Sequence, residues 1–279
     1  MRARWLTLLA AAMVATNLGA QPAVSPPETK EEVLQLPDMT VLGGPPPDNF
    51  VFPRKDEVTP PDFPPDDPNI HVQFPGHAVF EGVATGRATV GVMLDETGRP
   101  LDFLLIRYTR DYFGKALLAE AKDQHYTPKR LHGVAVPSTF TFSYHFEPPE
   151  GLTNVSSFEA AERRLEEVGG GAKYRYEPHR EAELDGGQLE LTRLAIPVLP
   201  AGQARPDQQP VKVLVSFYVD EQGRVRLPNV ESALAPELVA HAVQALQQWA
   251  FKPPAIKAKP VLVYAMRALT FRAVPPAGK

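Results

Sequence analysis

The pattern Asp-Glu-x-Gly-Arg occurs twice in this 279-residue chain, and carboxylates grouped in this way could hold a calcium ion or act as an acid–base pair. The two stretches read Asp-Glu-Thr-Gly-Arg from Asp95 and Asp-Glu-Gln-Gly-Arg from Asp220. A calcium loop needs further oxygen ligands at fixed spacing, and none follow either stretch. Each instead has Asp at the first position and Gly at the fourth, Gly98 or Gly223, which is the preference of a type I turn. We therefore interpret both stretches as turns that close hairpins.

Other residue types that could perform chemistry lack the spacing that it requires. The seven histidines show no metal-ligand spacing, and His145 and His241 fall on faces that should be exposed. The chain has no cysteine, no GxSxG nucleophile motif and no GxxxxGK[ST] phosphate loop. The sequence therefore predicts no catalytic residue, no metal, no cofactor and no enzymatic activity. A net charge of −4 gives no basic face for nucleic acid, so no nucleic-acid partner is expected.

The two turns belong to two longer stretches, from Arg87 and from Lys212, that align at one constant spacing. Apolar residues alternate with others ahead of each turn, which predicts a strand with one buried face. These apolar residues are Ala88, Val90, Val92 and Leu94 in the first copy and Val213, Val215, Phe217 and Val219 in the second. A second strand should follow each turn, and Pro228 predicts that the second strand of the second copy is bulged or lies at an edge.

A helix and a long third strand complete each copy. Apolar residues recur at helical spacing, and each helix ends in an aromatic residue with a proline two positions later. The helical residues are Phe113, Leu117 and Ala121 in the first copy and Leu238, Ala242, Leu246 and Trp249 in the second; the exits are Tyr126/Pro128 and Phe251/Pro253. The predicted fold class is therefore α+β, with two tandem small domains, each a three-stranded antiparallel sheet covered by one helix in the order strand–strand–helix–strand.

The remaining segments suggest an exported protein. Residues 1–20 combine two arginines, a short apolar run and small residues, which is typical of a secretory signal peptide. An uncleaved inner-membrane anchor is the alternative, although Thr16 and Asn17 interrupt the run. We interpret residues 21–75 as a proline-rich linker, serving as a spacer or as a tail without a role. Residues 76–147 form the first domain, 148–187 a connecting helix and hinge, and 188–279 the second domain.

Two features of the connecting region refine this division. Ser156 and Glu159 form a capping box that predicts a helix, and Gly169 to Gly171 predict a hinge after it. Beyond the hinge, leucines between Leu189 and Leu194 indicate a short strand or an extended packing arm. Since about 60 residues are marginal for an independent core, we expect flanking segments to contribute to each core.

The ordered set of turn, helix exit and third strand resembles the C-terminal domain of TonB and its relatives. The second copy carries the set as Asp220, Gly223, Arg224, Trp249, Phe251 and Pro253. The first copy is degenerate: it has Asp95, Gly98, Arg99, Tyr126 and Pro128, but Gln124 replaces the helix-end Trp. The resemblance covers the two copies, and a proline-rich spacer ahead of the domain is also typical of the family.

The resemblance implies a periplasmic protein of the Gram-negative envelope. Such domains grip an extended segment of an outer-membrane TonB-dependent transporter by adding it to the free edge of the third strand. Here that edge would run from Val261 to Phe271, and the implied partner-binding residues are Val261, Val263, Tyr264, Ala265 and Met266. The same edge could serve a homodimer. Family members that transmit force keep an uncleaved N-terminal helix, so the short apolar run leaves open a non-transducing interaction or scaffold protein with the same fold.

Overall fold

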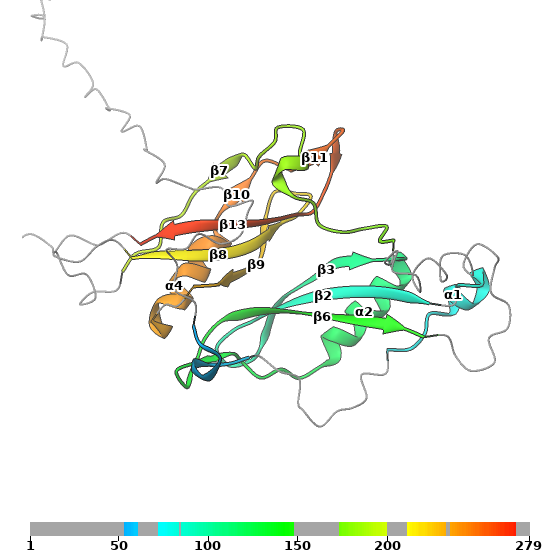
Figure 1. Ribbon diagram of the computed structural model, residues 1–279, viewed down its shortest axis with the longest axis horizontal. Coiled ribbons are helices and arrows are strands. Elements are labelled where there is room, and N and C mark those ends of the chain that lie inside the picture. Colours follow the sequence, from blue (N-terminus) through cyan, green and yellow to red (C-terminus); the bar gives the residue numbers. More distant parts are fainter. Residues whose placement is uncertain are drawn as a thin grey trace, which may run out of the picture. The chain divides into compact units, whose positions relative to one another are not determined.

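The computed structural model describes residues 53–60, 72–83, 85–147, 173–199, 211–232 and 235–271, which all belong to one compact unit, Pro37–Lys279 (Figure 1). The predicted signal peptide, most of the predicted linker, the helix expected from Ser156 and the glycine hinge lie outside the described residues.

The first copy folds as predicted. Its elements are β2 (Gly86–Leu94), β3 (Pro100–Tyr108), α2 (Asp111–Asp123) and β6 (Ser138–Phe146). The three strands form an antiparallel sheet in the order β3-β2-β6, so the first strand is central and the third lies at an edge. The predicted helix residues Phe113, Leu117 and Ala121 are buried between α2 and this sheet.

The second copy repeats this topology. It consists of β8 (Lys212–Val219), β9 (Val225–Val230), α4 (Pro236–Gln247) and β13 (Val263–Thr270), with the sheet order β13-β8-β9 (Figure 1). Each of its elements begins at or next to the position that the spacing between Asp95 and Asp220 predicts from the first copy. The predicted strand–strand–helix–strand order is therefore confirmed in both copies.

A small hairpin between helix and third strand also occurs in both copies, and the sequence did not reveal it. It is formed by β4 (Arg130–Leu131) with β5 (Val134–Ala135), and by β11 (Ala255–Ile256) with β12 (Lys259–Pro260). Both central residues of each turn have positive φ, which is the geometry of a tight two-residue hairpin. These residues are His132 and Gly133 in the first copy and Lys257 and Ala258 in the second. Only one of the four is glycine, so the usual sequence signal is missing.

The turn glycine and the helix exit, which the sequence shows as separate features, are in contact. Gly223 has a φ of 80°, and a Cβ added to it would lie 2.0 Å from the carbonyl oxygen of Phe251. The Phe251 N–H donates to the Gly223 carbonyl oxygen at 2.8 Å. At the matching position, a Cβ on Gly98 would lie 2.5 Å from the Tyr126 carbonyl oxygen. The hairpin turn therefore packs directly on the end of the helix, and both positions need a residue without a side chain.

Replacing Gly223 by alanine should lower the free energy of unfolding by about 2–4 kcal/mol, because strain at positive φ adds to a steric clash with backbone. Gly133 is the matched control: its φ is also 80°, but nothing lies within 4 Å of an added Cβ. Gly133→Ala should therefore cost only about 1–2 kcal/mol. Urea unfolding of both variants measures the difference. Equal decreases in the free energy of unfolding would show that the contact between the turn and the helix exit does not contribute to stability.

Two segments interpreted as linker or hinge are instead part of the fold. Within the predicted linker, η1 (Lys55–Glu57) leads into β1 (Val58–Thr59), and β1 pairs with β4. The short helix α1 (Gly76–Glu81) precedes the first copy. The interpretation of residues 21–75 as spacer is therefore wrong for residues 55–59, because a third strand completes the small β4–β5 hairpin.

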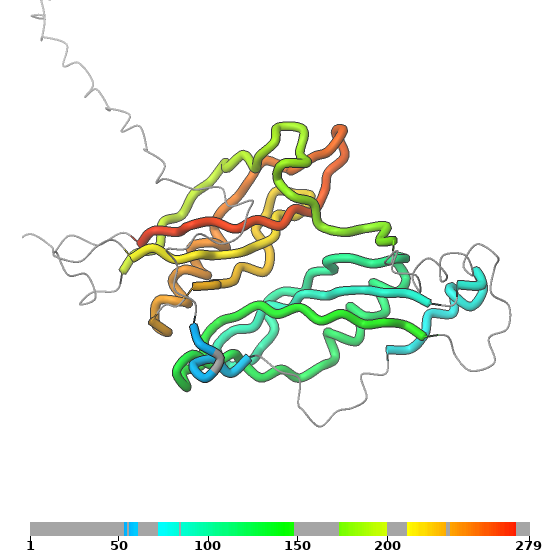
Figure 2. The backbone as a smooth tube through the Cα atoms, in the orientation of Figure 1, coloured from blue at the N-terminus to red at the C-terminus, as the bar shows by residue number. Residues whose placement is uncertain are grey.

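Residues 173–199 form an arm that packs on the second copy (Figure 2). The arm contains η3 (Glu181–Glu183) and β7 (Leu191–Arg193), and β7 pairs with β10 (Ala250–Phe251). Leu184, Leu189 and Leu199 join the core of the second copy. This confirms the predicted packing arm and the contribution of flanking segments to the core. Residues 173–187, at the end of the predicted connecting region, therefore belong to the fold, because backbone hydrogen bonds of this segment reach both sheets.

Strand β9 is both bulged and at an edge, as Pro228 predicted. The distortion places Leu227 at a φ of 48° and buries it. Its side chain fills the space above Gly91 of the first copy, where an added Cβ would lie 2.2 Å from the Leu227 Cδ1. Arg226 beside it donates to both carboxylate oxygens of Asp102, at 2.7 and 2.6 Å. One irregular strand therefore supplies contacts between the two copies.

Candidate functional site

The predicted partner-binding residues lie on or next to β13, but they do not share one environment. Val261 precedes the strand, and its N–H donates to the Pro254 carbonyl oxygen at 3.0 Å, so its assignment to the strand edge is corrected. Val263 and Ala265 are buried in the core of the second copy. Tyr264 and Met266 point to the opposite face of the sheet, and Tyr264 is 40% exposed.

The direction of the backbone groups shows which residues could pair with an added strand. The Tyr264 N–H points away from β8, because it donates to the His179 carbonyl oxygen at 3.1 Å. Backbone groups alternate along a strand, so those of Met266, Ala268 and Thr270 also point outward, whereas the Ala265 N–H faces β8. Within the described residues, no hydrogen bond is found for the outward N–H groups from Met266 onward.

The beginning of this edge is already occupied. The His179 N–H donates to the Leu262 carbonyl oxygen at 2.8 Å, and together with the Tyr264 bond this makes a parallel bridge between His179 and Val263. The open part of the edge therefore begins at Met266 and ends at Thr270. It is shorter than the sequence indicated, because the arm occupies the first part.

Arg267 is a functional candidate that the sequence analysis missed. It lies on the same buried face of β13 as Val263, Ala265 and Leu269, and its side chain is only 2% exposed. Its guanidinium donates to both carboxylate oxygens of Glu181, each at 2.6 Å, and to the Met266 carbonyl oxygen at 2.8 Å. The sequence feature that could have identified Arg267 is an arginine among the alternating apolar residues of the third strand. Such an arginine is unusual because a buried cation needs a paired anion.

A cleft of about 490 Å³ adjoins Tyr264. It is lined by residues of β6, the arm, β8, β9 and β13, including Thr139, Thr141, His179, Arg180, Ser216, Tyr218, Leu227, Asn229, Glu231 and Tyr264. Tyr218 and Tyr264 are cross-strand partners whose ring centroids lie 5.2 Å apart. Burial, with a smaller contribution from Tyr264, raises the pKa of Tyr218 to about 12, so its hydroxyl remains a hydrogen-bond donor at neutral pH.

The polar side chains of this cleft hydrogen-bond to neighbouring side chains. The Ser216 hydroxyl donates to Glu231, and the Asn229 amide donates to the same carboxylate oxygen at 3.0 Å. His179 contacts Glu183 at 2.8 Å through its Nδ1 and is not hydrogen-bonded to Ser216. A serine nucleophile needs a base that takes its proton, and a carboxylate already accepting two hydrogen bonds is poorly suited to this role.

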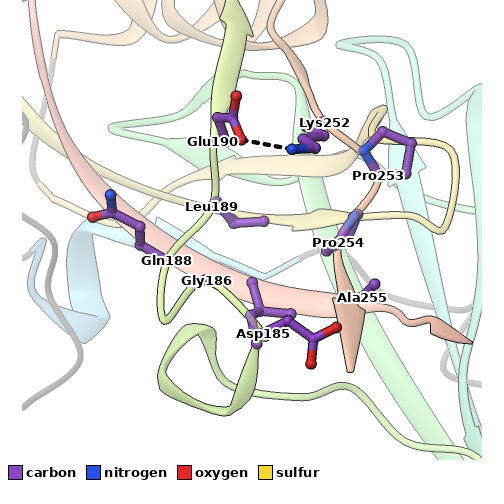
Figure 3. Close-up of a pocket in the computed structure, with 10 residues that line it drawn as sticks. Asp185, Gly186, Gln188, Leu189, Glu190, Lys252, Pro253, Pro254 and Ala255 are labelled. Carbon is purple, nitrogen blue, oxygen red and sulfur yellow. Dashed lines mark hydrogen bonds and ion pairs between the residues drawn. The ribbon is translucent and has the colours of Figure 1, made fainter. Parts of the chain in front are cut away.

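A second cleft, of about 270 Å³, lies between the arm and the exit of α4 (Figure 3). Glu190 and Lys252 form an exposed ion pair at its rim, with an N–O distance of 3.2 Å. Asp185 accepts hydrogen bonds from the Ala258 and Lys257 N–H groups, which lower the pKa of its carboxyl group. Asp185 thus holds the positive-φ turn of the second hairpin, and we interpret this cleft as structural.

The predicted turn and helix-exit residues are structural as well. The Asp220 side chain is 2% exposed; burial raises its pKa, but hydrogen bonds from the N–H and guanidinium of Arg224 and the N–H of Gln222 outweigh burial and lower it. Asp95 accepts equivalent bonds from the N–H groups of Thr97 and Arg99. Phe251 and Trp249 lie in the core of the second copy. Pro253 lies beside the same turn, because a Cβ added to Gly223 would lie 3.2 Å from the Pro253 nitrogen.

No family model, no curated protein and no solved structure matches this chain. In the described part of the chain, no cluster of His, Asp and Glu is suited to holding a metal ion. No helix among the same residues is both long and apolar enough to span a membrane.

Proposed function

We propose that this protein is a periplasmic interaction protein that binds an extended segment of another envelope protein, an outer-membrane transporter, by β-strand addition to β13. The observation that carries the proposal is the topology. In both sheets the first strand is central, which leaves the third strand at an edge, and in the second copy the outward N–H groups of Met266, Ala268 and Thr270 have no hydrogen bond among the described residues. Main-chain hydrogen bonds to such an edge supply affinity, and side-chain pockets supply specificity.

The fold and the cleft support this proposal. The strand–strand–helix–strand fold is the one that the resemblance to the TonB C-terminal domain implies, and it occurs twice. The exposed Tyr264 and the partly buried Tyr218 line the cleft beside the edge, where alternate side chains of an added strand would lie. The absence of a polarised nucleophile in the cleft favours binding over catalysis, and no cofactor is proposed.

A proline at Met266 should abolish binding of an extended segment without unfolding the sheet, because the Met266 N–H points outward. Proline removes this donor and is tolerated at a strand edge. The probe is a set of synthetic peptides that copy the periplasmic N-terminal segments of the source organism's outer-membrane transporters. We expect backbone resonances of Met266, Ala268 and Thr270 to shift on titration in the unchanged protein and not in Met266→Pro.

Met266→Ala is the matched control, because it removes the side chain and keeps the N–H, so binding should persist. A proline at Ala265 would be uninformative, because that N–H faces β8 and its loss would weaken the sheet itself. If the peptides shift only resonances far from β13, or if Met266→Pro binds them unchanged, strand addition at this edge is wrong. A concentration-dependent dimer that shifts the same resonances without peptide would identify a second copy as the occupant.

Force transmission is a separate question from binding. The apolar run near the N-terminus is interrupted at Thr16 and Asn17, which favours a cleaved signal peptide and a non-transducing interaction or scaffold protein. N-terminal sequencing of the mature protein and membrane fractionation test this. A chain that begins near Gln21 in the soluble fraction could not pull on a transporter, whereas a retained N-terminus in the inner membrane would favour an energy transducer.

A further inference from the structure

The arm contacts the outer edges of both sheets through one extended segment. Near its start, the Tyr108 N–H on the outer edge of β3 donates to the Tyr176 carbonyl oxygen at 3.0 Å. Three residues later, His179 exchanges two backbone bonds with the outer edge of β13. The Tyr176 ring stacks on Tyr108 with centroids 5.2 Å apart, and its hydroxyl donates to Glu221 at 2.6 Å. The segment is therefore bound in the way that a partner strand would be.

The arm leaves β13 after a single bridge, because η3 turns the chain away at Glu181. A short backbone contact of this kind provides little stability. The side chain of Glu181 compensates, since its carboxylate accepts two hydrogen bonds from Arg267 while both side chains are buried, at 10% and 2% exposed. Two parallel hydrogen bonds between guanidinium and carboxylate are both strong and directional.

Arg267 in turn depends on this carboxylate. Its Nε is buried without a hydrogen-bond partner among the described residues, and its other bond is to the neutral Met266 carbonyl. A buried cation that loses its anion is strongly unfavourable, so an empty edge is disfavoured. The first copy has no such requirement, because the alignment places Phe142 at the position of Arg267.

We propose that the outer edge of β13 accepts only a strand that supplies a carboxylate to Arg267, and that residues 178–183 of the chain are its resident occupant. A partner that takes over the whole edge must therefore be an extended acidic segment that runs parallel to β13. Its carboxylate must lie two residues after the residue that replaces His179. The requirement placed on a partner from another protein rests on the proposed function. The resident strand and the role of Arg267 do not depend on it.

The test uses the full chain with residues 178–181 replaced by Gly-Ser-Gly-Ser, which removes His179 and Glu181 and keeps the rest of the arm. The probe is a synthetic peptide of the chain's own residues 174–183, in two forms, with Glu181 or with Glu181→Gln. We expect the Glu form to bind and to shift the Tyr264 amide resonance. The Gln form should bind at least about tenfold more weakly, because it loses the charge-assisted pair. Equal affinity of the two forms, or no binding by the Glu form to the folded variant, would overturn the proposal.

Hydrogen exchange provides a second measurement if the replaced chain does not fold. In full-length Glu181→Gln, the Tyr264 amide should exchange about tenfold faster than in the unchanged protein, because its acceptor His179 is released. The Ala265 amide, which faces β8, should keep its protection and serves as the internal control. Unchanged protection of Tyr264 would contradict the proposal. If the chain's own peptide binds and transporter peptides do not, the proposed function fails and this inference stands.

Discussion

Replacing Trp249 by alanine is expected to lower the free energy of unfolding by about 3–5 kcal/mol, the usual cost of removing a buried large aromatic side chain. Trp249 is 2% exposed and makes an edge contact with Phe217, with ring centroids 5.8 Å apart. Its indole N–H donates to the Ala195 carbonyl oxygen at 2.7 Å. The Trp249 side chain therefore contacts both the sheet and the arm from the end of the helix, and its loss should destabilise all three.

The duplication supplies the matched control for this variant. Gln124 occupies the position of Trp249 in the first copy, where it is partly exposed and donates to Glu120 on the preceding turn. Gln124→Ala should change the free energy of unfolding by about 0.5 kcal/mol or less. Urea unfolding of both variants, followed by far-ultraviolet circular dichroism, measures the difference. Similar losses from the two substitutions would show that the two helix exits contribute equally, contrary to their different burial.

Replacing Arg267 by methionine should also destabilise the protein by about 3–5 kcal/mol, because it leaves the Glu181 carboxylate buried without its counter-ion. The size of the effect should come from the unpaired charge more than from lost packing. The double variant Arg267→Met with Glu181→Leu removes both charges and fills the space with apolar groups. It should therefore recover part of the stability, since apolar replacement of a buried pair is often neutral or stabilising, whereas the Leu189 N–H loses its acceptor on Glu181.

Lys115→Met is the control for a simple loss of an ion pair. Lys115 and Asp111 are paired at 2.7 Å, but their side chains are 74% and 58% exposed. Such exposed pairs contribute little to stability because solvent screens them, so this variant should unfold close to the unchanged protein. Thermal and urea unfolding of the four proteins form the experiment. A double variant no more stable than Arg267→Met would mean that the buried charge is not the cause of the loss.

These variants also bear on partner binding. Arg267→Met with Glu181→Leu removes the carboxylate requirement of the edge while keeping the sheet, so an acidic segment should lose its advantage over a neutral one. A stable double variant that still prefers acidic peptides would locate the preference elsewhere, for example at Arg180 in the adjoining cleft. Stability and selectivity are thus measured on the same proteins.

Much of the fold was predictable because it depends on local patterns that the chain repeats. Alternation before Asp95 and Asp220 placed the central strands, and the helical stripes and proline exits placed α2 and α4. Two copies of the same pattern made each interpretation stronger. The turn glycines were also identified correctly, although their reason was only partly local: Gly223 needs both a positive φ and room for the Phe251 carbonyl.

The proposed binding site on β13 was less predictable than the fold. Whether the edge of a strand is free depends on which other segments of the chain lie beside it. By itself the sequence determined that two sheet-and-helix units exist, that each third strand follows its helix, and that no catalytic motif is present, since these depend on periodicity and residue type. Only the tertiary structure decided that residues 178–183 lie against the start of β13, that Ala265 faces inward, and that Arg267 is buried against Glu181. These contacts join residues far apart in the chain, and no local pattern records which backbone groups remain without a partner.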